Sequence, residues 1–284
     1  MRVTVPALGT ALDLPGPAHR VVSLVSSATE VLFAIGAGGA VVGVTPYCAR
    51  YVEGLAVPVV ADYVDADPEA IRAVAPDLVL CTDGVQLPLA RRLAAAGLPV
   101  YLLPVPSSRF GLCENALQTG ALVGRLGEAR ALCDRLEREA AALQAAAPAR
   151  RPRVYAELWF GRHARRPGGR SFVHDLVTLA GGDHLFGDRT DAYAPLDLAA
   201  VAAARPEVVV VFSEPEFPID PGALVVERGW DRAFAPRVIT STPDRGRNLI
   251  HDGPSLLMTA RWLAGELRGA LRVFGHDVLL GSPR

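Results

Sequence analysis

Asp83 and Glu214 are the two residues whose type and position could support catalysis, because each follows an apolar run that predicts a β-strand. Two carboxylates can act as a general acid and a general base. The sequence otherwise argues against an enzyme, since it contains no GxSxG motif, no P-loop and no lysine, and no cysteine has a histidine near it. We therefore expect no catalytic residues, and we keep a small-molecule enzyme that uses Asp83 and Glu214 as an alternative.

Aromatic and arginine side chains gather in the loops after the predicted strands. Flat rings give a large apolar contact at low entropic cost, and guanidinium groups bind carboxylates or phosphates through paired hydrogen bonds. We expect ligand contacts from Tyr47, Cys48, Tyr63, Thr82, Asp83, Trp159, Phe160, Arg165, Arg166, Arg170 and Tyr193. The alternatives are rings that only pack against their own lobe and an arginine-rich loop, 162–170, that is only a solvated charged surface.

Composition excludes several other classes of protein. The net charge of −1 provides no basic field for nucleic acid. No segment approaches the roughly 18 uninterrupted apolar residues of a membrane span, so we expect a soluble protein. The four cysteines are scattered and the six histidines show no ligand spacing, so we expect no metal site, no disulfide framework and no cofactor. The N-terminal residues lack the apolar region of an export signal.

The order of predicted strands and helices gives the fold class. Strands are expected at 20–25, 41–44, 57–60, 78–81 and 100–103, and again at 154–158, 208–212 and 238–240, with helices between them. A capping box of Ser27 and Glu30 should open a helix at 29–35, and 159–170 should be a loop. Alternating strands and helices favour parallel sheets, whose ligands bind beyond the carboxyl ends of the strands.

A long amphipathic helix at 126–147 divides the chain into two similar halves. Residues 70–80 and 200–210 match at a constant offset of 130 residues, which indicates an internal duplication. The prediction is therefore an α/β protein of two Rossmann-like lobes with parallel sheets and a ligand cleft between them. The expected domains are an N-terminal lobe at 1–125, a bridging helix at 126–148 and a C-terminal lobe at 149–284.

Several stretches resemble the helical-backbone substrate-binding proteins of ABC importers, which bind cobalamin, haem and ferric siderophores. They are the segment from Arg20 to Gly36, the Val-Val-Gly-Val-Thr run, Ala-Pro-Asp-Leu-Val-Leu, and Gly169 to Gly182. The segment 43–48 and the Leu158-Trp159-Phe160 loop are most similar to the cobalamin-binding branch. The resemblance implies a periplasmic or cell-surface protein, monomeric, that holds a corrinoid between Tyr47 and Tyr63 on one side and Leu158, Trp159 and Tyr193 on the other.

The resemblance also implies an ABC permease as partner. Such proteins dock on their permease through one glutamate of each lobe, and Glu69 fits the first position. Ala199 stands where the second glutamate is expected, which weakens the expectation of docking. The arginine-rich loop favours haem or a carboxylate siderophore as alternative ligands. A leaderless cytoplasmic corrinoid-handling protein is the remaining alternative.

Overall fold

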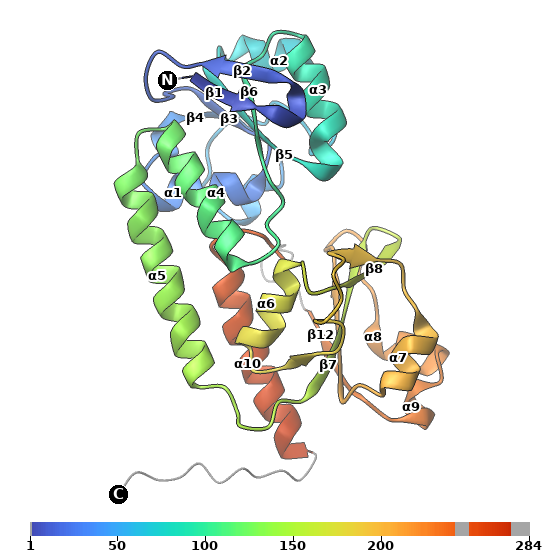
Figure 1. The fold of residues 1–284 in the computed structure, drawn as a ribbon. Coiled ribbons are helices and arrows are strands. Elements are labelled where there is room, and N and C mark those ends of the chain that lie inside the picture. The colour runs from blue at the N-terminus through green and yellow to red at the C-terminus, as the bar shows by residue number, and fades with distance from the viewer. Residues whose placement is uncertain (1, 242–249, 274–284) are drawn as a thin grey trace, which may run out of the picture. The chain divides into compact units, whose positions relative to one another are not determined.

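A computed structural model describes residues 2–241 and 250–273 of the chain (Figure 1). The chain divides into two compact units. Unit 1 comprises Met1–Leu136 with Asp252–Ser255, and unit 2 comprises Glu137–His251 with Leu256–Arg284. The helix predicted at 126–147 is present as α5 (Leu126–Ala145), and it contributes residues to both units.

Unit 1 is built on a four-stranded parallel sheet. Its order is β4-β3-β5-β6, with β3 (Val21–Ser23), β4 (Val41–Val44), β5 (Leu78–Thr82) and β6 (Val100–Leu103). All five residues of β5 are buried, as in a central strand whose sheet is covered on both faces. A separate hairpin pairs β1 (Arg2–Val5) with β2 (Thr10–Asp13). The predicted parallel α/β arrangement of this half is confirmed.

The helices of unit 1 connect these strands. They are α1 (Ser26–Ala34), α2 (Pro68–Ala73), α3 (Leu87–Ala95), α4 (Arg109–Leu122) and the short 3-10 helices η1 (Pro6–Leu8), η2 (Gly38–Ala40), η3 (Cys48–Arg50) and η4 (Gly84–Gln86). Helix α1 begins three residues earlier than predicted, and the capping box is wrong: the N-cap is Val25, without a side-chain cap. The Thr29 hydroxyl lies 3.1 Å from the Val25 carbonyl oxygen instead. The strand predicted at 57–60 is reduced to one bridge between Val44 and Val59.

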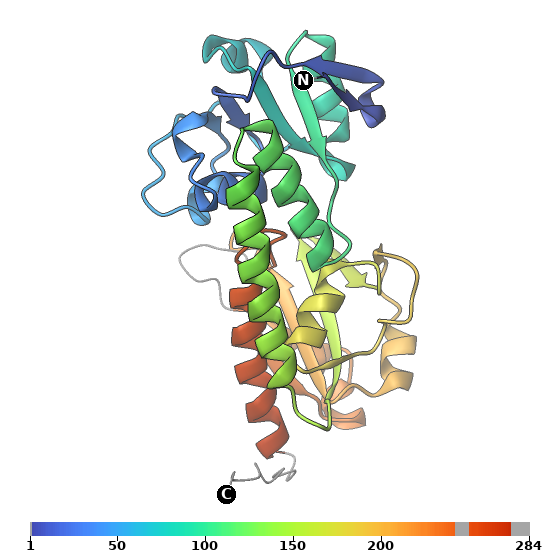
Figure 2. The ribbon, with the colours of Figure 1, turned by 60° about the vertical axis from the view of Figure 1, so that its left-hand side comes forward.

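Small residues allow α4 and α5 to pack closely in unit 1. A Cβ atom at Gly120 would lie 2.6 Å from the Cβ of Ala129, so only glycine fits at this contact. Figure 2 shows α4 alongside the first half of α5. Close approach of two backbones maximises the dispersion contacts between the helices.

Unit 2 contains a mixed sheet in the order β10-β8-β7-β11-β12, with β9 also paired to β7. Its strands are β7 (Arg153–Phe160), β8 (His163–Pro167), β9 (Asp183–His184), β10 (Tyr193–Ala194), β11 (Val208–Ser213) and β12 (Arg237–Thr240). Strands β9, β11 and β12 extend the sheet in parallel, whereas β8 and β10 add antiparallel pairs. Two predictions are therefore corrected: 159–170 is largely a hairpin, and the second sheet is not purely parallel.

Helices lie on both faces of the unit 2 sheet (Figure 1). They are α6 (Phe172–Leu179) and α10 (Leu256–Val273) on one face, and α7 (Leu198–Ala204), α8 (Pro221–Glu227) and α9 (Trp230–Ala233) on the other. On the second face Tyr155 packs edge-to-face against Phe186 and Trp230, with ring centroids 6.1 and 5.9 Å apart. This aromatic cluster is the centre of an apolar core that fixes β7 in the unit.

The duplication inferred from sequence is visible in local geometry. Asp67 and Asp197 cap α2 and α7, and each side chain accepts a backbone N–H of the first turn. At the end of these helices Ala75 and Arg205, again 130 residues apart, both adopt positive φ angles, +44° and +47°. Two equivalent helices thus begin and end in the same way.

Candidate functional site

The candidate residues of unit 1 lie after β4 and β5, at the carboxyl edge of the sheet. Tyr47 and Tyr63 are both half-buried, and their rings meet edge-to-face with centroids 6.2 Å apart. The Arg50 guanidinium carbon lies 4.9 Å from the centroid of the Tyr47 ring. Sequence reasoning did not include Arg50, which adds a cation at the edge of this aromatic pair.

Gln86 is a second residue that sequence reasoning missed. Its carboxamide is fully buried; its oxygen accepts the Thr82 N–H (2.9 Å), and its Nε2 donates to the carbonyl oxygens of Leu24 (2.9 Å) and Tyr63 (2.6 Å). One side chain therefore joins the ends of β3 and β5 to the loop that carries the Tyr63 ring. The only sequence signal was a glutamine just beyond the Thr82-Asp83-Gly84 turn.

Cys48, Thr82 and Asp83, which we predicted to contact the ligand, make contacts within the protein. Cys48 is fully buried, with its sulfur 3.1 Å from Thr29 Oγ1, and the Thr82 hydroxyl donates to the Leu103 carbonyl oxygen (3.2 Å). Asp83 Oδ1 accepts the Val105 N–H (2.7 Å). Burial of the first two side chains gives them a structural role, so we remove them from the set of expected ligand contacts.

In unit 2 the half-buried Trp159 is held by a buried carboxylate. Its indole N–H donates to Glu157 Oε1 (2.7 Å), and Glu157 is also bound by Arg228 through both of its oxygens (2.8 and 3.0 Å). The Tyr155 hydroxyl donates to Glu157 Oε2 (2.8 Å), and burial together with this negative charge raises the pKa of Tyr155. Sequence reasoning missed Glu157 and Arg228, because they lie 71 residues apart in the chain.

Two exposed rings lie near the turn of the β7–β8 hairpin. Phe160 is 43% exposed and meets Tyr193 edge-to-face, with centroids 6.5 Å apart. Phe217, which was not predicted, is 46% exposed and lies against Gly161, where an added Cβ would be 3.8 Å from its ring. Leu158, by contrast, is 1% exposed because its side chain points to the opposite face of the strand from Trp159. It is a core residue in this structure.

The three predicted arginines differ in their surroundings. Arg166 is buried; it pairs with Asp191 (3.0 Å) and lies over the Phe186 ring, 4.7 Å from its centroid. Arg165 is half-buried and donates to the Ala164 carbonyl oxygen (2.9 Å), whereas Arg170 is exposed. Arg166 thus ties β8 to the segment just before β10, and its burial argues against the predicted ligand contact.

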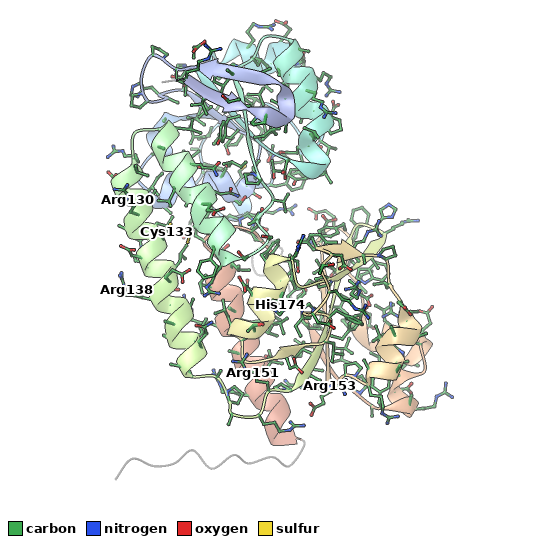
Figure 3. All side chains as sticks on the ribbon, viewed as in Figure 1. Arg130, Cys133, Arg138, Arg151, Arg153 and His174 are labelled. Carbon is green, nitrogen blue, oxygen red and sulfur yellow. The ribbon has the colours of Figure 1, made fainter. Side chains whose placement is uncertain are left out.

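The half-buried His174 and the buried His184 lie together elsewhere in unit 2, near the amino end of β7. Figure 3 shows His174 on α6, with Arg151 and Arg153 at the start of β7. The Nδ1 atoms of the two histidines are 3.3 Å apart. Burial, and then the positive charges of His174 and Arg166, lower the pKa of His184 to about 4. His184 is thus neutral at pH 7.

The two carboxylates of the enzyme alternative make hydrogen bonds within the protein. Asp83 and Glu214 each accept a backbone N–H from a residue distant in sequence, Val105 and Gly161 respectively. No cluster of three or more potential metal ligands occurs among the described residues. The helices described in the structure include none that is both long and apolar enough to cross a membrane.

The predicted docking residue Glu69 and its counterpart Ala199 occupy equivalent positions. Each is the second residue of its helix, after Pro68 in α2 and after Leu198 in α7, and both are exposed. Glu69 is paired with Arg72 on the same helix. The 130-residue offset therefore identifies equivalent surface positions correctly.

Two α/β units connected through a long helix, with aromatic side chains at the strand ends of each, constitute a binding protein of the two-lobed class. Residues 21–243 match the family model described as "Periplasmic binding protein". The chain belongs to this family, and the resemblance seen in the sequence is confirmed at that level.

Curated relatives carry cobalamin in their names. A "Cobalamin-binding protein" of Halobacterium salinarum is 31% identical over 222 residues, which cover 73% of this chain and 58% of the relative. A "Vitamin B12-binding protein" of Yersinia pseudotuberculosis is 27% identical over 217 residues, covering 74% of this chain and 75% of the relative. The chain thus spans little more than half the length of the Halobacterium protein. The names describe binding proteins, not enzymes.

Solved structures show the same fold. The periplasmic heme-binding protein RhuT from Roseiflexus sp. RS-1 matches with a TM-score of 0.73 at 24% identity, covering 89% of this chain and 99% of RhuT. The periplasmic vitamin B12-binding protein BtuF of Vibrio cholerae matches with a TM-score of 0.70 at 19% identity, covering 91% of this chain and all of BtuF. At these identities the likeness establishes architecture.

Proposed function

We propose that this chain is the substrate-binding component of an ABC importer and captures cobalamin or a related corrinoid. The observation that carries the proposal is the presence of aromatic side chains at the strand ends of each unit: the half-buried Tyr47 and Tyr63 in unit 1, and the half-buried Trp159 and Tyr193 with the exposed Phe160 in unit 2. Rings presented on ordered strand ends suit a broad, flat macrocycle, since they bury a large apolar area at little entropic cost. The names of the curated relatives support the same ligand class.

Two of the three predicted arginines already bond within the protein, which favours a corrinoid over a strongly anionic ligand. The loop 162–170 suggested a cluster of cations, but Arg166 is neutralised by Asp191 and Arg165 turns one nitrogen to its own backbone. Haem remains the second candidate because Arg170 of the same loop is exposed, and a guanidinium group forms strong paired hydrogen bonds with a carboxylate.

An absorbance titration with cyanocobalamin and with hemin, each followed by gel filtration, tests the proposal. We expect stoichiometric retention of cyanocobalamin, and an increase in its Kd of at least tenfold in Tyr47→Ala. Tyr101→Ala is the matched control, because it removes a tyrosine of the same unit that bonds Gln118 within the protein. Retention of hemin alone would favour haem, and retention of neither ligand would contradict the proposal.

We further propose that the protein acts outside the cytoplasm and docks on its permease asymmetrically, with Glu69 on one unit and an apolar position at Ala199 on the other. Ala199→Glu should increase binding to a permease of this family if docking uses both helices. No increase would leave Glu69 as the docking glutamate, whereas no detectable binding of wild type or Ala199→Glu to the permease would count against an importer role and favour a corrinoid-handling protein that works without a permease.

A further inference from the structure

Glu157 is a charged group in the apolar core of unit 2. It is 0% exposed and accepts four hydrogen bonds, two from Arg228 and one each from Tyr155 and Trp159. A buried carboxylate is costly unless it is paired and fully hydrogen-bonded. Here Arg228 supplies the charge, and its side chain is only 10% exposed. The pair is thus neutral overall and held rigidly.

Tyr155, Glu157 and Trp159 alternate along β7 and so lie on one face of the sheet. Tyr155 is fully buried and Trp159 is half-buried, so this row leads from the core toward the end of the strand. The bond from Trp159 Nε1 to Glu157 Oε1 directs the polar edge of the indole inward. The indole N–H is therefore occupied, and the ring retains only its apolar surface for a ligand.

We propose that Glu157, fixed by Arg228, is a positioning residue that holds the Trp159 ring in its ligand-binding orientation. This inference rests on the proposed function, in which Trp159 contacts a macrocycle. Immobilising a large side chain during binding reduces affinity, so a ring that is already fixed before the ligand arrives binds more tightly. The alternative is that the buried pair only stabilises the core.

The test uses variants that remove the acceptor of the indole N–H without leaving a buried charge. Tyr155→Phe is the reference, since it deletes a hydroxyl on the same carboxylate and leaves the bond to Trp159 intact. The test variant combines Tyr155→Phe with both Glu157→Met and Arg228→Met. The ion pair is replaced as a whole because replacing a complete buried ion pair by apolar side chains often preserves the fold. Thermal unfolding of each variant checks that it does so here.

The Kd for cyanocobalamin is then measured for the reference and for the test variant, each with Trp159 and each with Trp159→Phe. The Phe substitution removes the indole N–H but keeps an aromatic ring. With Trp159 present, we expect the Glu157→Met/Arg228→Met change to raise the Kd by roughly three- to tenfold, the effect of one immobilised side chain. With Phe at position 159 we expect no further change. An equal increase in both backgrounds, or none in either, would overturn the positioning role.

Failure of this inference can be distinguished from failure of the proposed function. If the wild-type protein retains neither cyanocobalamin nor hemin, the function is wrong and the inference is overturned with it. If wild type binds but the two backgrounds respond equally, only the positioning role is lost. Hydrogen exchange of the Trp159 indole N–H, followed by NMR without ligand, gives an independent readout: slow exchange supports the tether, and rapid exchange in wild type contradicts it.

Discussion

Gln86 and Glu157 show how single polar side chains order the candidate contacts. Both side chains are fully buried and make several hydrogen bonds. One of the bonds of Gln86 is to Tyr63, and one of the bonds of Glu157 is to Trp159. Gln86 bonds the backbone carbonyl of Tyr63 and so orders the loop that carries its ring, whereas Glu157 bonds the Trp159 ring itself. Neither residue would itself face the ligand.

Removing the Gln86 carboxamide should destabilise the protein, because it leaves the Thr82 N–H and the Leu24 and Tyr63 carbonyl oxygens without this partner. We expect Gln86→Ala to lower the free energy of unfolding by about 2–4 kcal/mol, measured by urea unfolding. Gln118→Ala, which removes a half-buried bond to Tyr101, is the control and should cost about 1 kcal/mol. Equal losses in the two variants would contradict the conclusion that Gln86 contributes more than Gln118 to the free energy of unfolding.

His184 should make stability depend on pH. Its pKa is lowered from 6.5 to about 4 by burial first, and then by the charges of His174 and Arg166. The unfolded chain therefore binds more protons between pH 6.5 and 4, and the free energy of unfolding falls as the pH drops through that range, by up to about 3 kcal/mol.

Urea unfolding at pH 7 and pH 4.5 checks this expectation. His184→Asn retains a polar atom near the Nδ1 position but does not titrate, so its loss of stability on acidification should be smaller than that of wild type. His19→Asn changes an exposed histidine and serves as the control. If wild type and His184→Asn lose the same free energy between the two pH values, His184 does not titrate as described.

The repeated helices α2 and α7 end with a residue that carries a side chain in the left-handed region, where glycine is favoured. Ala75→Gly should therefore stabilise the protein by about 0.5–1 kcal/mol, the relief of Cβ strain less the added freedom of the unfolded chain. Ala70→Gly, inside α2, is the matched control and should destabilise by about 1 kcal/mol. The midpoints of urea unfolding should move in opposite directions, and movement in the same direction would refute the assignment.

Ligand binding should stabilise the folded protein by mass action. At a concentration of 100 times its Kd, cyanocobalamin should add about 2.7 kcal/mol to the free energy of unfolding. The increase, measured as a shift of the urea midpoint, should be much smaller in Trp159→Ala at the same ligand concentration. No shift in wild type at a concentration that saturates binding would show that the ligand does not prefer the folded state.

The sequence predicted those features that depend on local patterns. The apolar run of β5 and the matched segments around 70–80 and 200–210 identified the parallel strands and the duplication. The hairpin of β7 and β8 was missed because β8, His-Ala-Arg-Arg-Pro, has the composition of a polar loop and is a strand only through its pairing with β7. Tertiary contacts override local propensity there.

The candidate site was predicted less completely than the fold. Tyr47 and Tyr63 lie in loops beyond the strands of the parallel sheet, as the α/β pattern led us to expect, whereas Trp159 and Phe160 end β7 and Tyr193 lies in the antiparallel strand β10. Whether a polar side chain faces outward depends on partners that are distant in sequence. Arg166 pairs with Asp191, and Cys48 contacts Thr29. The Glu157–Arg228 pair joins β7 to the end of α8, a relation that no spacing in the sequence encodes.

The assignment of Asp252–Ser255 to unit 1 affects how the protein is made. These residues return to unit 1 more than a hundred positions after Leu136, and Ser255 donates a hydrogen bond to Glu30 of α1 (3.1 Å). At a translation rate of about 5–20 residues per second, the ribosome adds them roughly 6–23 s after it has completed the first segment. Unit 1 therefore stays incomplete, and exposed to chaperones and proteases, until most of unit 2 has been synthesised.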